Sequence, residues 1–78
     1  MRVIEKKMCE AVKGRRTWAL DNTRVQNMDG ITVAVYLFGN HIADVNTFTG
    51  EIKVNERTFA RWPTRTTKSR LRALGANI

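Results

Sequence analysis

The fold is decided by residues 29–46, which read DGITVAVYLFGNHIADVN. Residues 31–38 alternate between two sets of side chains with the period of a β-strand. One set is Ile31, Val33, Val35 and Leu37, and the other is Thr32, Ala34, Tyr36 and Phe38. Asp29-Gly30 favours a type I′ hairpin turn, in which both central residues need positive φ, and Gly39-Asn40 is the next hairpin signal. The stretch therefore predicts an antiparallel sheet built from hairpins.

The flanking residues extend this hairpin into a meander. Residues 23–28 alternate weakly before the first turn, and residues 41–46 return after the second. Residues 51–54 form a short last strand after a third turn at Thr49-Gly50. We expect three or four antiparallel strands joined by tight turns.

Helices are predicted on both sides of the meander. Residues 3–13 place their apolar side chains in a stripe about 100° wide, as a core-facing helix does, and Gly14 is the expected stop. Residues 55–63 read as irregular. A final helix follows Pro63, with Thr64 or Thr66 as its N-cap and Gly75 as its stop. Its expected core-facing pair is Leu71 and Leu74. The predicted fold class is α+β, with both helices packed on one sheet face of a single domain, residues 1–78.

Charge divides the chain into three parts. Residues 1–16 hold six basic and two acidic side chains, residues 17–56 hold two and five, and residues 57–78 hold six and none. The formal net charge is +7. If the two basic ends fold side by side, they form one positive face, which attracts polyanions such as nucleic acid. An acidic protein partner and simple solubility are the alternatives.

Composition argues against several classes of protein. Hydrophobic residues make up 42% of the chain, too many for a disordered tail. One Cys cannot form an intramolecular disulfide or a Cys-based zinc site, and no apolar run approaches the ~20 residues of a membrane span. His41 and Asp44 stand three apart on a predicted strand, which would place them on opposite faces. We therefore expect no enzyme activity, no cofactor, no metal and no membrane association. A homodimer remains open, because so short a chain buries only ~60% of its unfolded surface.

The leading candidate site is the basic start of the final helix, residues 62–72, WPTRTTKSRLR. A helix N-terminus offers unpaired N–H groups and a partial positive charge to phosphate. Ser69 and Ala73 are expected on the solvent face between cations, where small side chains allow close approach to a nucleic-acid backbone. A merely solvated helix face is the alternative. The expected nucleic-acid contacts, to DNA more than RNA, are Arg15, Arg16, Arg61, Thr64, Arg65, Thr66, Thr67, Lys68, Arg70 and Arg72.

Exposed aromatic side chains give a second candidate surface. Tyr36, Phe38 and Phe48 are candidate anchors for a host bacterial protein, because aromatic residues dominate binding hot spots. If the helices cover only the Ile31 face, Tyr36 and Phe38 lie on the open one. There they could stack bases of single-stranded nucleic acid, contact a second subunit, or be covered by the rest of the fold.

Two segments carry a resemblance to a known group of proteins. Residues 35–43, VYLFGNHIA, and residues 62–71, WPTRTTKSRL, resemble the Y-L-x-G-N-x-I-A hairpin and the W-x-T-x-T-T-K-x-R-L helix start of small, uncharacterised basic proteins of tailed bacteriophages. The resemblance implies work in the cytoplasm of an infected bacterium, by binding DNA or by binding and disabling a host protein. It implies no catalytic residues.

Overall fold

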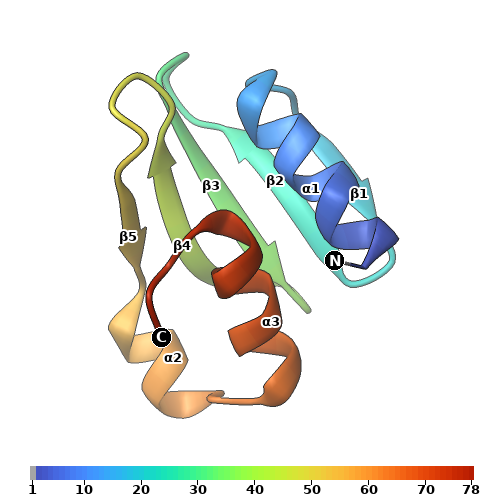
Figure 1. The fold of residues 1–78 in the computed structure, drawn as a ribbon, viewed down its shortest axis with the longest axis vertical. Helices are drawn as coiled ribbons and strands as arrows, with labels where there is room; N and C mark the ends of the chain where they lie inside the picture. Colours follow the sequence, from blue (N-terminus) through green and yellow to red (C-terminus); the bar gives the residue numbers. More distant parts are fainter. Residues whose placement is uncertain (1) are drawn as a thin grey trace.

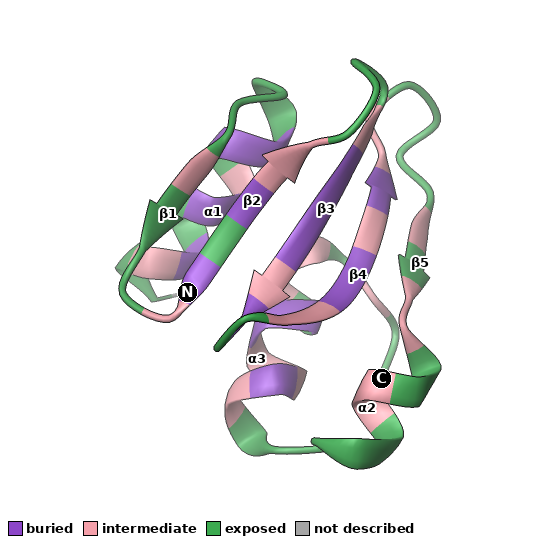
Figure 2. Ribbon diagram, turned by 180° about the vertical axis from the view of Figure 1, so that it is seen from behind, coloured by how far each residue is buried: buried purple, intermediate pink, exposed green. Residues whose placement is uncertain are grey.

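The fold is known from a computed structural model that describes residues 2–78. Its elements are α1 (Val3–Lys13), β1 (Trp18–Leu20), β2 (Thr23–Asn27), β3 (Thr32–Leu37), β4 (Asn40–Asn46), β5 (Ile52–Val54), α2 (Glu56–Arg61) and α3 (Arg65–Leu74). Helices α1 and α3 lie on one face of the sheet, α1 over β1 and β2 and α3 beside β3 and β4 (Figure 1). The opposite face carries neither helix (Figure 2).

The sheet is an antiparallel meander in the order β1-β2-β3-β4-β5. It has five strands in place of the three or four expected, because Trp18–Leu20 pairs with β2 as an additional edge strand. Three residues are too few to show alternation in sequence. Both edge strands, β1 and β5, are three residues long, which limits the unpaired backbone exposed at the sheet edges.

The turns differ from the predicted ones in position and type. Leu37 pairs with Asn40, so the β3–β4 turn is centred on Phe38-Gly39, one residue before Gly39-Asn40. Both residues have positive φ, the pattern of a type I′ turn. Between β2 and β3 only Gly30 has positive φ, so the predicted type I′ turn at Asp29-Gly30 is wrong. The Asp29 carboxylate instead accepts hydrogen bonds from the backbone N–H groups of Ile31 and Thr32.

A β-bulge in β4 changes which side chains share a sheet face. Val35 pairs with Ala43 but Tyr36 pairs with His41, so Ile42 is an extra residue on β4. The bulge lets Ile42 join Ala43 in the core, although neighbours on a regular strand point to opposite faces.

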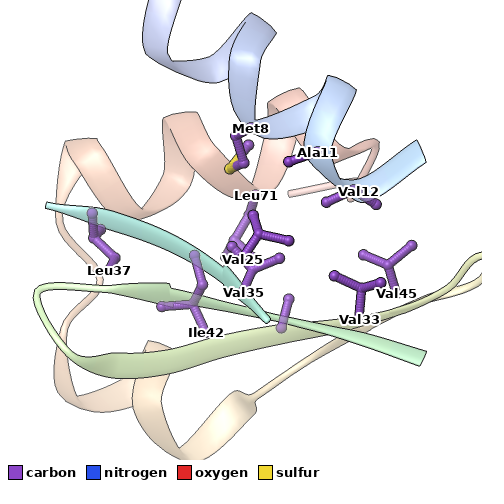
Figure 3. Packing of buried hydrophobic residues seen from close by; sticks show 11 residues of the cluster. Met8, Ala11, Val12, Val25, Val33, Val35, Leu37, Ile42, Val45 and Leu71 are labelled. Atoms are coloured by element: carbon purple, nitrogen blue, oxygen red, sulfur yellow. The ribbon is translucent and has the colours of Figure 1, made fainter. Parts of the chain in front are cut away.

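The hydrophobic core lies between the sheet and the helices α1 and α3 (Figure 3). Val33, Val35 and Leu37 are buried as predicted, but Ile31 lies in the β2–β3 loop and is exposed. Helix α1 supplies Met8, Ala11 and Val12, and α3 supplies Leu71, which is fully buried. The sheet adds Val25, Ile42, Ala43 and Val45. Leu74 packs partly buried at the edge of this cluster.

The helix boundaries confirm most of the sequence signals. Helix α3 begins at the Thr64 N-cap, whose hydroxyl accepts from the Thr67 N–H, and ends at Gly75, with φ of 108°. After α1 the left-handed residue is Arg15 and not Gly14, whose φ is −82°. Residues 56–61, expected to be irregular, form α2, because the Asn55 side chain caps it through the Thr58 N–H. Within residues 2–78 the structure contains no helix long and apolar enough to span a bilayer.

Candidate functional site

Two clefts run along the contact between α1 and α3. One, about 380 Å³ in volume, lies between Arg2, which precedes α1, and Arg65 and Arg72 on α3. The other, about 570 Å³, extends to the β4–β5 loop and is bordered by Lys6 and Lys13. We call these five exposed cations (Arg2, Lys6, Lys13, Arg65 and Arg72) the helix seam. The fold thus brings the two basic ends of the chain together on one side of the sheet.

Glu5 lies at the bottom of the first cleft, and its charge is neutralised there. Its Oε2 accepts hydrogen bonds from the Ser69 hydroxyl and from Nη1 of Arg70, the latter at 2.7 Å. Burial alone would raise the pKa of Glu5, but the hydrogen bonds from Ser69 and Arg70 and the Arg70 charge outweigh it and hold the pKa below its ordinary value. Glu10 is the other carboxylate that lines the two clefts, so the surface of the seam stays strongly positive.

Arg70 is part of the core and cannot serve as the predicted phosphate contact. Its side chain is 3% exposed, and besides Glu5 it donates from Nε to Thr23 Oγ1 at 3.0 Å and from Nη2 to Asn22 Oδ1 at 3.4 Å. Thr67 is also buried, and its hydroxyl is hydrogen-bonded to that of Thr64 at 2.9 Å. Both residues are therefore wrong as predicted phosphate contacts, since each side chain is buried and forms its hydrogen bonds inside the protein.

The strip of small residues on α3 faces α1 and is half-buried. Ser69 donates to Glu5, and the backbone carbonyl of Ala73 accepts from Cys9 Sγ at 3.3 Å. Ser69 and Ala73 do line the first cleft beside Arg65 and Arg72, as expected, but they are half-buried and not on an open solvent face, because their small side chains allow the two helices to approach. Burial raises the pKa of the Cys9 thiol, which keeps it protonated as a donor at neutral pH.

The remaining predicted cations and hydroxyls lie on several sides of the molecule. Arg65 and Arg72 belong to the helix seam, and Lys68 is half-buried on the same helix. The exposed Arg15 and Arg16 follow α1, where Arg15 Nε donates to Thr47 Oγ1 at 2.8 Å. Arg61 ends α2. Thr64 caps α3, and both Thr64 and Thr66 line a separate pocket beside the β3–β4 turn.

Tyr36, Phe38 and Phe48 do not form one surface. Tyr36 lies half-buried on the face without α1 and α3, with the Arg24 guanidinium 4.3 Å from its ring centroid. Phe38 and Phe48 precede and follow β4, so they lie at opposite ends of the sheet. The three side chains therefore do not form one aromatic cluster, and their use as anchors for a host protein stays a prediction.

A family model described as Kyanoviridae Gp96 protein matches residues 1–78. The chain belongs to this phage protein family. No curated protein and no solved structure matches it. Phage origin, implied by the resemblance of the hairpin and helix-start segments, is thus supported for this Kyanoviridae Gp96 family member.

Sequence reasoning missed two features of this family member. The charge pattern of the sequence includes Arg2, Lys6 and Lys13 but cannot place them beside Arg65 and Arg72, since that depends on the packing of α1 on α3. His41 and Asp44, expected on opposite faces, form a pair with 2.8 Å between Nε2 and Oδ1, because the bulge at Ile42 adds a residue between them. The His41 ring also lies 5.2 Å from that of Tyr36. A bulge has no local sequence signal here.

Proposed function

We propose that this phage protein binds nucleic acid, DNA in the first instance, through phosphate contacts along the helix seam, and catalyses no reaction. The observation that carries the proposal is the seam itself. Five exposed cations from both ends of the chain converge on one pair of clefts, and the carboxylate at the bottom of the narrower cleft is neutralised by Arg70. Such a concentration of positive charge attracts polyanions and binds them largely without regard to base sequence.

The seam cations have distinct roles in this proposal. Arg2, Arg65 and Arg72 border the same cleft, so their guanidinium groups can share the phosphates of one strand, and Arg suits phosphate because its donors form a planar fork. Lys6 and Lys13 extend the positive path along α1. Infected bacterial cytoplasm is the setting in which we propose that this binding occurs.

The salt dependence of binding tests the proposal. If each of the five seam cations engages one phosphate of duplex DNA, the logarithm of the binding constant should fall against the logarithm of salt concentration with a slope of about −4.5. We expect fluorescence anisotropy of a labelled duplex to show tight binding at about 50 mM salt and a collapse by about 200 mM. Arg65→Gln and Arg72→Gln should each make the slope shallower by about one unit.

Lys53→Gln is the matched control, because Lys53 is an exposed cation on β5 and lies outside the seam, opposite Asp44 in the strand register. Its slope should equal that of the parent protein. Absence of binding at low salt, or equal slopes for all three variants and the parent, would remove the seam from the function.

A second candidate function is the binding of a host protein, and the end of the sheet opposite the β3–β4 turn favours it. Met28, Ile31 and Phe48 are exposed there, Phe48 by 80%. Thr47 joins the two loops, since its N–H and its hydroxyl both donate to the Ile31 carbonyl. Rigid exposed apolar side chains are typical of binding hot spots.

One variant of each surface distinguishes this second function from the first. Tagged protein should retain one stoichiometric protein from a nuclease-treated lysate of the bacterial host. Phe48→Ser should lose it, whereas Arg65→Gln should keep it. Retention by Phe48→Ser would contradict this use of the loop end.

A further inference from the structure

A pocket of about 390 Å³ opens between the β3–β4 turn and the segment that joins α2 to α3. The buried side chains of Leu37 and Ile42 form its apolar wall, and Asn40 and Thr66 add polar groups. Phe38 and Trp62 border it with rings that are exposed to solvent, since these residues are 71% and 47% exposed. An apolar pocket with a few polar groups is the usual form of a small-ligand site.

Phe38 occupies a position that neither the turn nor the core explains. Its φ is +52°, in the left-handed region where a bulky residue is an outlier, and the first central residue of this type of turn is ordinarily Asn, Asp or Gly. Burial of the ring does not offset this strain, because the ring remains largely exposed to solvent. Strained residues of this kind concentrate at binding sites, where the side chain has a use outside the fold.

The pocket and the helix seam adjoin at the start of α3. Thr64 and Thr66 line the pocket, and Arg65 between them lines the cleft that it shares with Arg2. No carboxylate lines the pocket, and no acidic residue follows Glu56 in the chain. A nucleic acid held at Arg65 would therefore lie next to residues whose chain neighbours line the pocket.

We infer that this pocket receives the base of an unpaired nucleotide, which stacks on Phe38 and Trp62 while the adjoining phosphates follow Arg65 into the helix seam. The inference rests on the proposed function and adds a preference for single-stranded nucleic acid. Aromatic rings accept any base by its π-face, so stacking here gives affinity with little sequence selection. The binding of a protein side chain in the same pocket is the competing outcome of the test.

Two oligonucleotides of equal charge separate the contribution of the bases to affinity from that of the phosphates. One is an oligothymidine of about 12 nucleotides, and the other has the same length and phosphates but carries abasic sites throughout. By anisotropy at low salt, we expect the oligothymidine to bind about 5- to 150-fold more tightly than the abasic strand. Phe38→Asn should reduce its affinity to that of the abasic strand and leave duplex binding unchanged.

Phe38→Asn should not unfold the protein, so a loss of binding in this variant can be attributed to the missing aromatic ring. Asn-Gly is the preferred pair for this turn, so its urea midpoint should equal or exceed that of the parent. Phe48→Asn, an exposed phenylalanine beyond the other end of β4, is the matched control and should bind both strands as the parent does. Trp62→Leu should lose part of the preference for bases.

The outcomes separate the pocket from the seam. Equal binding of the oligothymidine and the abasic strand, or an unchanged base preference in both Phe38→Asn and Trp62→Leu, would overturn the base pocket while salt-dependent duplex binding still supports the seam. Equal losses in Phe38→Asn and Phe48→Asn would overturn it too. If neither strand nor the duplex binds at low salt, the seam fails and the base pocket fails with it.

Discussion

Glu5 and Arg70 are 65 residues apart in the sequence and form one ion pair inside the folded protein. Each side chain is at most 5% exposed, and Thr23 and Ser69 satisfy further hydrogen bonds of the pair. Taking two charges out of water is favourable only when such partners are present. The pair therefore specifies how α1, α3 and β2 meet, because any other packing would leave a charge buried without compensation.

The ion pair makes stability depend on pH in a defined direction. The pKa of Glu5 lies below its ordinary value of 4.5 in the folded protein, so its contribution is complete above about pH 4.5 and is lost as the pH falls through the folded pKa. At pH 7, Glu5→Gln should lower the free energy of unfolding by about 3 kcal/mol, because Arg70 stays buried without its partner. In urea unfolding, this difference from the parent should shrink steadily below pH 4.5.

Glu10→Gln, on the exposed side of the same helix, is the control and should change the urea midpoint at pH 7 little, because it leaves no buried charge without a partner. A gap between parent and Glu5→Gln that stays constant down to pH 3 would contradict the role given to the Glu5 carboxylate.

At the scale of elements, α3 depends on its first hydrogen bond. The Thr64 hydroxyl accepts from the Thr67 N–H at 3.2 Å, and the same helix carries Arg70 and Leu71 into the interior. Thr64→Ala should destabilise the protein by about 1 kcal/mol through loss of the cap, a fall of about 4–8 °C in the melting temperature. Thr66→Ala, within the same first turn, makes no cap and should change the melting temperature little. Equal effects of the two substitutions would show that capping does not limit α3.

The longer elements could be predicted from sequence, and the shorter ones could not. Helix α1 has an apolar stripe over 11 residues, and α3 has a Thr cap and a Gly stop. In contrast, β1 has three residues and α2 has six, too few for the two-residue period of a strand or the 3.6-residue period of a helix to be recognised in the sequence. Helix α2 depends on the Asn55 cap, which is a common residue in loops as well.

The candidate site was predictable in composition and not in arrangement. Arg70 is expected at the surface because charged residues usually face solvent. Only Glu5, which lies on a helix far away in the sequence, makes its burial favourable. The same packing turns Ser69 and Ala73 toward α1. Pairing of His41 with Asp44 depends on one extra residue in β4, which strand periodicity cannot anticipate.

At the scale of the whole molecule, the positive charge is unevenly distributed. The helix seam gathers five cations, while the face without α1 and α3 mixes Arg24 and Lys53 with Asp44. If a polyanion binds the seam in the folded protein alone, it stabilises that state by mass action. Duplex DNA at about 100 times its dissociation constant should add about 2.7 kcal/mol, which for a protein of this size raises the melting temperature by about 10–20 °C.

Differential scanning calorimetry with and without duplex DNA checks this expectation. The rise should be large at low salt and should disappear at high salt, because the phosphate contacts are exchanged for counterions. A rise that is equal at both salt concentrations would contradict electrostatic binding at the seam.

The sheet pairs every strand with its neighbour in sequence, but the cover over its apolar side comes from both ends of the chain. During synthesis the five strands can pair as soon as residue 54 has emerged, since hairpin contacts are local and form quickly. Leu71 and the partner of Glu5 emerge later, so until then the chain holds an open apolar surface and an unmatched carboxylate. Completion of the native state therefore waits for α3, and a chain truncated between residues 54 and 70 would be prone to misassociation.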